Sequence, residues 1–175
     1  MKLFDRLKSK KIVNIFIKQN TGELIFLQGF NQKNLYCTKN KNDQNIKIIN
    51  KENLKRRIGD LSFYVTQQKG TEMPFSGEYL SNKEEGVYKC IVCDADLFSS
   101  DHKYDSKSGW PSFYDSNDQK SLKINSDLSH NMIREEVCCS NCDAHLGHLF
   151  NDGPSPTHKR YCINSLSLNF VNKQN

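Results

Sequence analysis

The chain lacks any apolar run of the ~20 residues that a membrane-spanning helix needs. The longest apolar segment near its start, Ile12–Ile17, is short and is interrupted by Asn14, so a cleavable secretory signal is not expected either. Hydrophobic residues make up only 36% of the 175 residues, and mean hydropathy is −0.73. Ten Phe, seven Tyr and one Trp still supply core material, which argues against wholesale disorder. This length predicts one domain, or one domain with an appendage.

Charge is divided unevenly along the chain. Residues 1–57 carry 14 basic and 4 acidic side chains, a balance of +10, whereas residues 58–175 carry 11 and 16, a balance of −5. A basic stretch of this kind can bind nucleic acid or a membrane surface, or act in import. A solvated, lysine-rich face is the simpler interpretation, because a run of charge alone is weak support for a partner.

Seven cysteines are present, an odd number, and no signal peptide is expected before them. Both facts disfavour a secreted disulfide scaffold. Two Cys-x-x-Cys pairs point instead to metal or redox chemistry in a reducing compartment. The seven positions are Cys37, Cys90, Cys93, Cys138, Cys139, Cys142 and Cys162.

The pattern along the chain is mainly of the β type. Two branched and aromatic segments, Ile12–Ile17 and Leu24–Leu27, flank a turn signal at Asn20-Thr21-Gly22, which predicts a β-hairpin. Residues 31–53, rich in Asn, Lys and Gln, are interpreted as a linker. Helical signal is scant in the rest, and the predicted strands are Ser62–Thr66, Tyr88–Val92, Arg134–Cys138 and Leu166–Val171.

The two Cys-x-x-Cys pairs, Cys90/Cys93 and Cys139/Cys142, are separated by 45 residues and are each followed by Asp-Ala. Two such knuckles can close a tetrahedral thiolate cage, which structural zinc prefers. A closed cage leaves no position for water, so we expect a stabilising ion. Either Cys138 or Cys139 could be the first ligand of the second pair, but only Cys139 keeps the two-residue spacing of the first pair. A redox role for one pair is the alternative.

Cys162 lies outside both pairs. A free cysteine is most often a small buried hydrophobe, but Arg160 can lower the thiol pKa if the two side chains meet. His145 and His148 directly follow the second knuckle, where a rigid scaffold would hold them. Surface packing is the alternative for this pair. Trp110, the only tryptophan, is equally consistent with a core position and with the wall of an apolar pocket.

Taken together, these residues resemble the B-type methionine sulfoxide reductases over roughly Leu61–Val171. Shorter matches occur at Gly70-Thr71-Glu72, Pro74-Phe75, Gly77-Glu78-Tyr79 and Lys103-Tyr104-Asp105-Ser106. The long blocks are GWPSFY at 109–114, CDAHLGHLF at 142–150, NDGPSPT at 151–157 and RYCINS at 160–165. No Gly-Cys-Phe-Trp stretch of the unrelated A-type enzyme is present.

The resemblance implies a mainly β fold of two antiparallel β-sheets, with a structural zinc ion, few short helices and a hairpin-like N-terminal extension. It implies that Cys162 attacks the sulfoxide sulfur and becomes a sulfenic acid. Trp110 would wall the methyl pocket, while Phe150 and Arg160 shape the site. His145, His148 and Asn164 would orient substrate and water and help to protonate the sulfoxide oxygen. The implied partners are oxidised protein or peptide methionine as substrate, and thioredoxin or another thiol as reductant. The protein is expected to be a monomer.

One departure concerns regeneration. Many family members carry a resolving cysteine between Lys-Tyr-Asp-Ser and Gly-Trp, and here Ser108 stands at that place. Serine cannot form the disulfide, so an external thiol is expected to reduce the sulfenic acid directly. Cys37 is the second candidate for regenerating Cys162. Cys138 is the third, and its reach is more constrained because it adjoins an expected zinc ligand.

The expected organisation is a basic extension at 1–57, a catalytic domain at 58–172 and a tail at 173–175, in the cytoplasm or, alternatively, in an organelle reached through the basic N-terminus. A nucleic-acid-binding zinc module is the competing hypothesis, supported by the thiolate cage and the basic segment. It leaves Cys162, both histidines and the GWPSFY block unexplained. The third hypothesis is a reductase-like scaffold with impaired catalysis, because a fold does not guarantee its function. Neither nucleic acid nor a membrane is an expected partner.

Overall fold

The computed structural model describes residues 15–18, 24–27, 35–40 and 43–173, and the chain forms two compact units, Met1–Leu35 and Tyr36–Asn175. In the first unit, β1 (Ile15–Lys18) pairs antiparallel with β2 (Leu24–Leu27). This confirms the hairpin, although residues 12–14 and the turn at 20–22 lie outside the described residues.

The linker predicted for residues 31–53 was wrong. This segment contains β3 (Leu35–Asn40) and β4 (Asp43–Asn50), which form a two-stranded sheet, and then the first turn of a helix. Composition misled the prediction because Asn and Lys are abundant in the whole N-terminal third. The alternation in Asn45-Ile46-Lys47-Ile48 is that of a strand.

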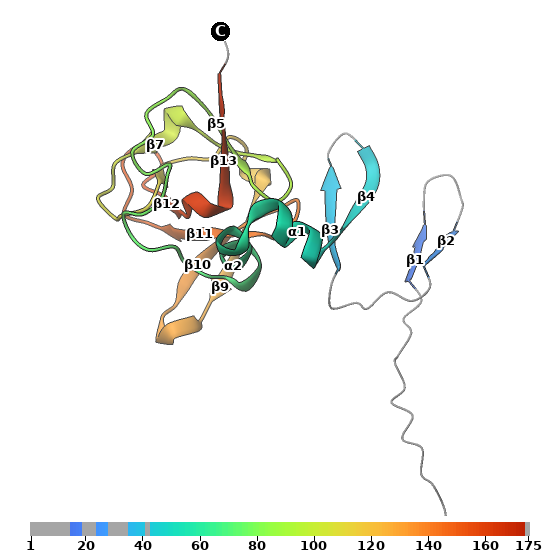
Figure 1. The fold of residues 1–175 in the computed structure, drawn as a ribbon. Coiled ribbons are helices and arrows are strands. Elements are labelled where there is room, and N and C mark those ends of the chain that lie inside the picture. Colours follow the sequence, from blue (N-terminus) through green and yellow to red (C-terminus); the bar gives the residue numbers. More distant parts are fainter. Residues whose placement is uncertain (1–14, 19–23, 28–34, 41–42, 174–175) are drawn as a thin grey trace, which may run out of the picture. The chain divides into compact units, whose positions relative to one another are not determined.

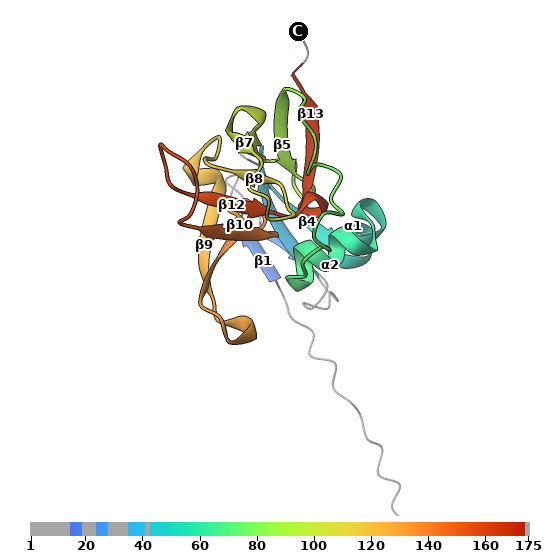
Figure 2. The ribbon, with the colours of Figure 1, turned by 90° about the vertical axis from the view of Figure 1, so that its left-hand side faces the viewer.

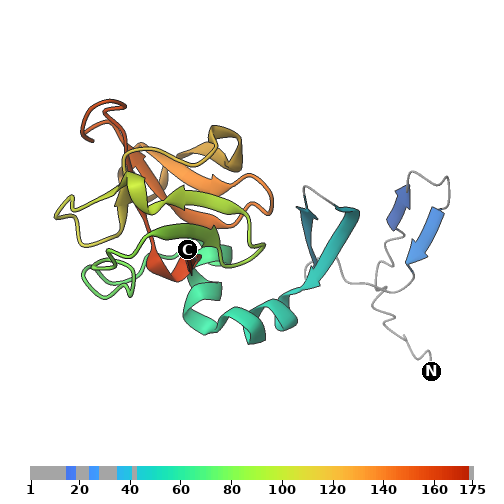
Figure 3. The same cartoon turned by 90° about the horizontal axis from the view of Figure 1, so that it is seen from above.

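Two short helices follow, and one replaces a predicted strand. α1 (Lys51–Ile58) begins where the Asn50 side chain accepts a hydrogen bond from Glu52 N, and it ends at Gly59, whose φ is +83°. α2 (Asp60–Gln68) covers the segment 62–66 that we predicted to be a strand. Its buried residues, Ser62, Phe63, Val65 and Thr66, follow helical spacing. α2 packs on the turn after β12 (Arg160–Ile163) and on β11 (His145–Phe150) (Figure 3).

Two antiparallel sheets form the body of the second unit (Figure 1). The smaller sheet has the strand order β13-β5-β6, and its strands are β13 (Leu168–Asn172), β5 (Gly86–Cys90) and β6 (Asp96–Ser99). The larger has the order β7-β8-β12-β11-β10-β9. Its strands are β7 (Lys103–Tyr104), β8 (Ser112–Phe113), β9 (Leu122–Asp127), β10 (Arg134–Cys139), β11 (His145–Phe150) and β12 (Arg160–Ile163).

The predicted strands at Tyr88–Val92 and Arg134–Cys138 are therefore confirmed as β5 and β10, with boundaries shifted by one or two residues. The segment predicted at Leu166–Val171 is divided between the short helix η5 (Ser165–Ser167) and β13. The other 3₁₀ turns of the described residues are η2 (Ser100–His102), η3 (Gln119–Ser121) and η4 (Ser129–Asn131).

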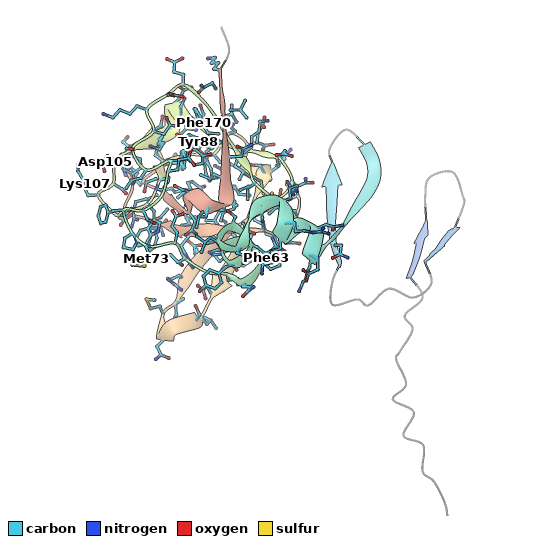
Figure 4. All side chains as sticks on the ribbon, in the orientation of Figure 1. Phe63, Met73, Tyr88, Asp105, Lys107 and Phe170 are labelled. Carbon is cyan, nitrogen blue, oxygen red and sulfur yellow. The ribbon has the colours of Figure 1, made fainter. Side chains whose placement is uncertain are left out.

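Aromatic side chains from both sheets form the core. Phe98 stacks on Phe113 with ring centroids 4.5 Å apart, and Tyr88 contacts Phe113 edge-on at 5.1 Å. Phe170 packs on Tyr88, as Figure 4 shows. From the larger sheet, β12 contributes the fully buried Tyr161 and Ile163. Alternation along β12 then places Arg160 and Cys162 on the opposite face.

The hairpin of β9 and β10 projects from the larger sheet, with η4 at its tip (Figure 2). Its tip exposes Leu128 and Ile133, whose exposed fractions are 71% and 89%. Among the described residues, no helix is both long and apolar enough to span a bilayer.

Candidate active site and metal centre

The four knuckle cysteines come together at the ends of two strands. Cys90 ends β5 in the smaller sheet and Cys139 ends β10 in the larger one. In both knuckles the first cysteine accepts a hydrogen bond at its carbonyl from the Asp amide, and its own amide donates to the Ala carbonyl, over 2.8–2.9 Å. Both aspartates, Asp94 and Asp143, have φ near +60°. The repeated Cys-x-x-Cys-Asp-Ala pattern is thus one backbone turn used twice.

The geometry of these sulfurs fits a single ion. All four Sγ atoms lie within 4.8 Å of one another, and the pairs Cys90–Cys142 and Cys93–Cys139 are 3.7 and 3.6 Å apart. A tetrahedron with Zn–S bonds of about 2.3 Å has sulfur–sulfur edges of about 3.8 Å. The cluster is therefore compatible with a metal site. Arg57 of α1 braces the first knuckle by donating to the carbonyls of Ile91 and Val92.

Cys162 lies in the middle of a row of side chains across the larger sheet. Residues directly opposite one another in neighbouring antiparallel strands project from the same face. Ser112 on one side and His148 on the other are the register partners of Cys162. The full row, from β7 to β9, is Tyr104, Ser112, Cys162, His148, Glu136 and Asn125.

A β-bulge brings the second histidine onto the same face as this row. His145 and His148 are three residues apart, which in a regular strand places side chains on opposite faces. Val137 of β10 opposes Gly147, but Cys138 opposes His145, so Leu146 is the extra residue of a bulge. The two imidazoles consequently lie edge to face, with centroids 5.5 Å apart.

Three mutually hydrogen-bonded serine hydroxyls lie beside the Cys162 thiol. Ser108 Oγ is 3.7 Å from Cys162 Sγ, and Ser106 Oγ lies 2.8 Å from Ser108 Oγ and 2.7 Å from Ser112 Oγ. Burial raises the pKa of the Cys162 thiol, and Ser108, Arg160 and Ser112 offset only part of this effect. Arg160 acts on the thiol in the expected direction, but desolvation outweighs it.

Arg160 and Phe150 form one unit beside the thiol. They are register partners on β12 and β11, and the guanidinium carbon lies 4.2 Å from the centroid of the phenyl ring. Asp152 accepts from Arg160 Nε at 2.7 Å and from its Nη2 at 2.8 Å. This bidentate pair fixes the plane of the guanidinium.

His148 is held by a carboxylate from the projecting hairpin. Its Nε2 lies 2.8 Å from Asp127 Oδ2, which also accepts from Arg134 Nη2 at 2.8 Å. Hydrogen bonds from Ser129, followed by that of His148, keep the pKa of Asp127 well below its ordinary value. Asp127 therefore stays ionised at neutral pH and orients the half-buried His148 ring.

His145 is almost fully buried, and a second carboxylate holds it. His145 Nδ1 lies 2.8 Å from Glu136 Oε1, and Lys69 Nζ lies 2.8 Å from Glu136 Oε2. Burial lowers the pKa of His145, against the effect of Glu136, so the ring is neutral at neutral pH and Nδ1–H donates. His145 Nε2 has no hydrogen-bond partner among the described residues.

Trp110 and Asn164 border Cys162 from two other directions. Trp110 is half buried, and its amide lies 3.4 Å from Ser108 Oγ. The buried Asn164 carboxamide accepts from Glu72 N at 3.0 Å and donates to Leu146 O at 2.9 Å. All seven predicted site residues thus lie on, or next to, one face of β11 and β12. They are Cys162, His145, His148, Asn164, Trp110, Phe150 and Arg160.

Sequence reasoning missed the carboxylates that support these side chains. Asp127, Glu136 and Asp152 each bond a predicted site residue, and Glu72 bonds Asn164 through its backbone. Only Asp152 and Glu72 fell within quoted sequence blocks, and neither had an assigned role. An aspartate 21 residues before its histidine carries no local signal.

Comparison with known proteins matches the chain to the SelR domain over residues 58–172. It is also similar to proteins named peptide methionine sulfoxide reductase MsrB in three Escherichia coli strains, O139:H28 (E24377A), K12 (DH10B) and O157:H7 (EC4115). Each is 56% identical over 124 residues, which cover 71% of this chain and 90% of the relative.

Proposed function

The chain belongs to the SelR-domain family of B-type methionine sulfoxide reductases, peptide-methionine (R)-S-oxide reductases, and from this premise we propose that Cys162 is its nucleophile. The observation that carries this proposal is the register of the larger sheet. Among the described residues, Cys162 is the only partly exposed thiol outside the cysteine cluster, and the register puts it between Ser112 and His148.

The net reaction moves one oxygen from the substrate sulfur to the Cys162 sulfur. Cys162 Sγ attacks the sulfoxide sulfur and forms a sulfur–sulfur bond, and the protonated sulfoxide oxygen leaves as water. Attack of water on Cys162 Sγ then breaks the sulfur–sulfur bond, releasing methionine and leaving Cys162 as a sulfenic acid. The thiol is oxidised by two electrons and the sulfoxide is reduced by two. Because sulfoxide oxygen leaves poorly until it is protonated, a proton donor is needed beside it. His148, in register with Cys162 and oriented by Asp127, takes this role.

The substrate sulfur carries a methyl group and an oxygen that must be told apart. Trp110 would supply the apolar wall for the methyl group, and the polar row of His145 and His148 would face the oxygen. The Arg160–Phe150 unit closes the site on a third side. An apolar wall opposite a proton donor favours one epimer, since the other would place its oxygen against the indole.

The test is turnover of separate R and S epimers of an N-blocked methionine sulfoxide, with dithiothreitol as the reductant. The proposal expects turnover of the R epimer alone, with the sulfenic acid trapped by dimedone on Cys162 when the reductant is omitted. Turnover of neither epimer by metal-loaded protein contradicts the activity. Turnover without dimedone labelling of Cys162 contradicts the intermediate.

Zinc is the ion that the cluster fits, on its sulfur–sulfur distances and its four-thiolate composition. Cys90, Cys93, Cys139 and Cys142 would hold it and leave no position for substrate. When bound, the ion would supply rigidity to the ends of β5 and β10. Cys138 belongs elsewhere: Asn125 Nδ2 donates to its sulfur over 3.5 Å.

Regeneration proceeds through an external thiol, which thioredoxin or a small thiol can provide. The thiol condenses with the sulfenic acid to give a mixed disulfide and water, and a second thiol releases Cys162 with formation of a disulfide. Ser108 Oγ lies 3.7 Å from Cys162 Sγ, but serine has no sulfur with which to form a disulfide. Cys138 is buried, and the side chain of Cys37 lies outside the described residues.

Replacing Ser108 by cysteine is expected to create an internal resolving thiol. The two side-chain atoms are already 3.7 Å apart, so a small rotation brings two sulfurs within bonding distance. After one turnover, the Ser108→Cys variant should contain a disulfide between the introduced thiol and Cys162, visible by mass spectrometry of unreduced peptides. Thioredoxin-supported turnover should rise roughly tenfold, while dithiothreitol-supported turnover changes little. Ser106→Cys is the matched control, and an equal gain there contradicts the geometry.

The reactivity of Cys162 should rise steeply with pH. Burial raises the pKa of the Cys162 thiol above its ordinary value, so the protonated thiol predominates at neutral pH in the free enzyme. Alkylation by iodoacetamide should therefore increase roughly tenfold per pH unit between about pH 6 and pH 9. Peptide mass spectrometry follows this rate at Cys162 alone. A plateau below about pH 8 would show that Arg160 outweighs desolvation.

Exposed apolar side chains around the site support a protein-bound substrate. Met73 and Phe75 have exposed fractions of 74% and 70% on a loop whose Phe75 amide bonds Gly109 O, next to Trp110. Met73 lies at the edge of the second unit in Figure 4. A pocket of about 540 Å³ lies beside Phe75 and Gly109 and is lined further by Tyr104 and Lys107. Chain segments flanking an oxidised methionine can occupy such surfaces.

Residues 58–172 are proposed as the catalytic domain, 1–57 as a basic extension and 173–175 as a tail. α1 spans the boundary at residue 57, and its Leu54 is fully buried in the core. A monomer in the reducing cytoplasm fits the free thiol of Cys162 and its need for a thiol reductant.

A further inference from the structure

Glu72 is a buried acid with an unusual set of partners. Its side chain lies on the loop after α2, and the residue is only 6% exposed. The carboxylate accepts hydrogen bonds from Ser165 N at 2.7 Å and from Leu166 N at 3.0 Å. These amides begin η5, directly after the strand that carries Cys162. Among the described residues, no basic side chain pairs with this carboxylate, so the two amides alone hold it.

The backbone of the same residue contacts two site residues. Glu72 N donates to Asn164 Oδ1 at 3.0 Å, and Glu72 O accepts from Trp110 Nε1 at 3.2 Å. Its carboxylate therefore anchors the loop to the chain following Cys162, and its carbonyl holds the edge of the indole. Glu72 therefore connects the Trp110 indole to the chain segment that follows Cys162.

Neighbouring residues leave this clamp little freedom. A Cβ atom on Gly77 would lie 2.3 Å from Ser165 Oγ and 2.8 Å from Glu72 Oε1. Tyr79 N, two residues further along, is 3.2 Å from Ser165 Oγ. The backbone at Gly77 thus packs directly against the Glu72 carboxylate and the Ser165 hydroxyl. Only a residue without a side chain fits at position 77.

We propose that Glu72 is a positioning residue that sets the separation between the Trp110 wall and Cys162, and hence the fit of the methyl group of the substrate. This proposal rests on the proposed roles of Trp110 and Cys162. A carboxylate is required because both of its partners are N–H donors, which an amide can satisfy only on its oxygen side. A displacement of about 1 Å at a reacting centre costs roughly 100-fold in rate.

The experiment compares Glu72→Gln with Glu78→Gln, an exposed glutamate of the same loop, as the control. With the R epimer, Glu72→Gln should lose roughly 10- to 100-fold in kcat/KM, with the larger part in KM. The alkylation rate of Cys162 at fixed pH should stay within about twofold of wild type. Trp110 is the only tryptophan, so emission excited selectively at tryptophan, and not at the seven tyrosines, reports this indole alone. This emission should shift to longer wavelength in Glu72→Gln.

A double-mutant cycle separates positioning from general destabilisation. Trp110→Phe keeps an aromatic wall but removes the donor to Glu72 O. If Glu72 acts through the indole, Glu72→Gln should cost at least threefold less in the Trp110→Phe background than in wild type. Equal losses in both backgrounds overturn the proposal. So does an unchanged emission spectrum, a result that needs no turnover and stands even if the proposed reaction fails.

A second pair of variants covers the case in which Glu72→Gln does not fold. Glu72→Asp retains the charge but shortens the reach to the two amides, and Gly77→Ala presses on the carboxylate from the other side. Both should shift Trp110 emission and raise KM in folded protein. Loss of kcat with unchanged KM and unchanged emission in both variants contradicts a positioning role.

Discussion

Cys162→Ser should lose the reduction of R-methionine sulfoxide by roughly three orders of magnitude or more while the protein stays folded. A serine hydroxyl does not ionise near neutral pH and is a poor nucleophile towards sulfur, so the oxygen transfer loses its acceptor. The three hydroxyls of Ser106, Ser108 and Ser112 already lie beside this position, and a fourth fits the same hydrogen-bonded group. Release of methionine in a single turnover, measured by chromatography, gives the rate without any regeneration step.

Cys37→Ser is the matched control for this variant, because it removes a thiol outside the catalytic row. It should retain full single-turnover activity. Residual activity above about a tenth of wild type in Cys162→Ser would mean that another thiol performs the attack. Unfolding temperatures of the two variants, compared with wild type, separate a chemical defect from a structural one.

Loss of the metal should affect stability more than any other single change. Apparent binding free energies of structural zinc sites are about 10 kcal/mol, comparable with the total of about 5–15 kcal/mol that stabilises a typical domain. Cys139→Ser should therefore lose the ion and unfold, or melt at a temperature tens of degrees lower. Atomic emission gives the metal content per chain, and circular dichroism gives the melting temperature.

Cys138→Ala is the control for the metal prediction, since Cys138 is the adjacent buried thiol but bonds Asn125 instead of joining the cluster. It should keep one zinc per chain and a melting temperature close to that of wild type. If Cys138→Ala loses the metal and Cys139→Ser keeps it, the metal ligand of the second knuckle is Cys138 and not Cys139.

The residues proposed for the site could be named from the sequence, but their arrangement could not. Cys162, Trp110 and the two histidines lie in long sequence blocks with a family resemblance, and the repeated Cys-x-x-Cys-Asp-Ala pattern gave the metal cluster. The bulge at Leu146 was not predictable, because nothing in Ala-His-Leu-Gly-His distinguishes a bulged strand from a regular one. Without the bulge, the two histidines would face opposite sides.

Partners that are distant in the sequence were equally hidden. Glu72 meets Ser165 across 93 positions and Lys69 meets Glu136 across 67, so local pattern carries no trace of either pair. Segment 62–66 was predicted as a strand because of its aromatic and branched residues. Burial against η5 and β11 selects the helix instead, a tertiary effect that overrides propensity.

The position of the metal cluster also bears on the order in which the domain assembles. Synthesis releases the chain from its N-terminus, so all four knuckle cysteines emerge before Cys162 and the strands β12 and β13 exist. An ion bound at the proposed site at that stage would close the long loop between β5 and β10 and remove much of the loop-closure entropy from the remaining folding. The thiol of β12 would then be added to a frame that is already in place, and the nascent chain would pass through a stage that is folded at the four cysteines but still lacks Cys162.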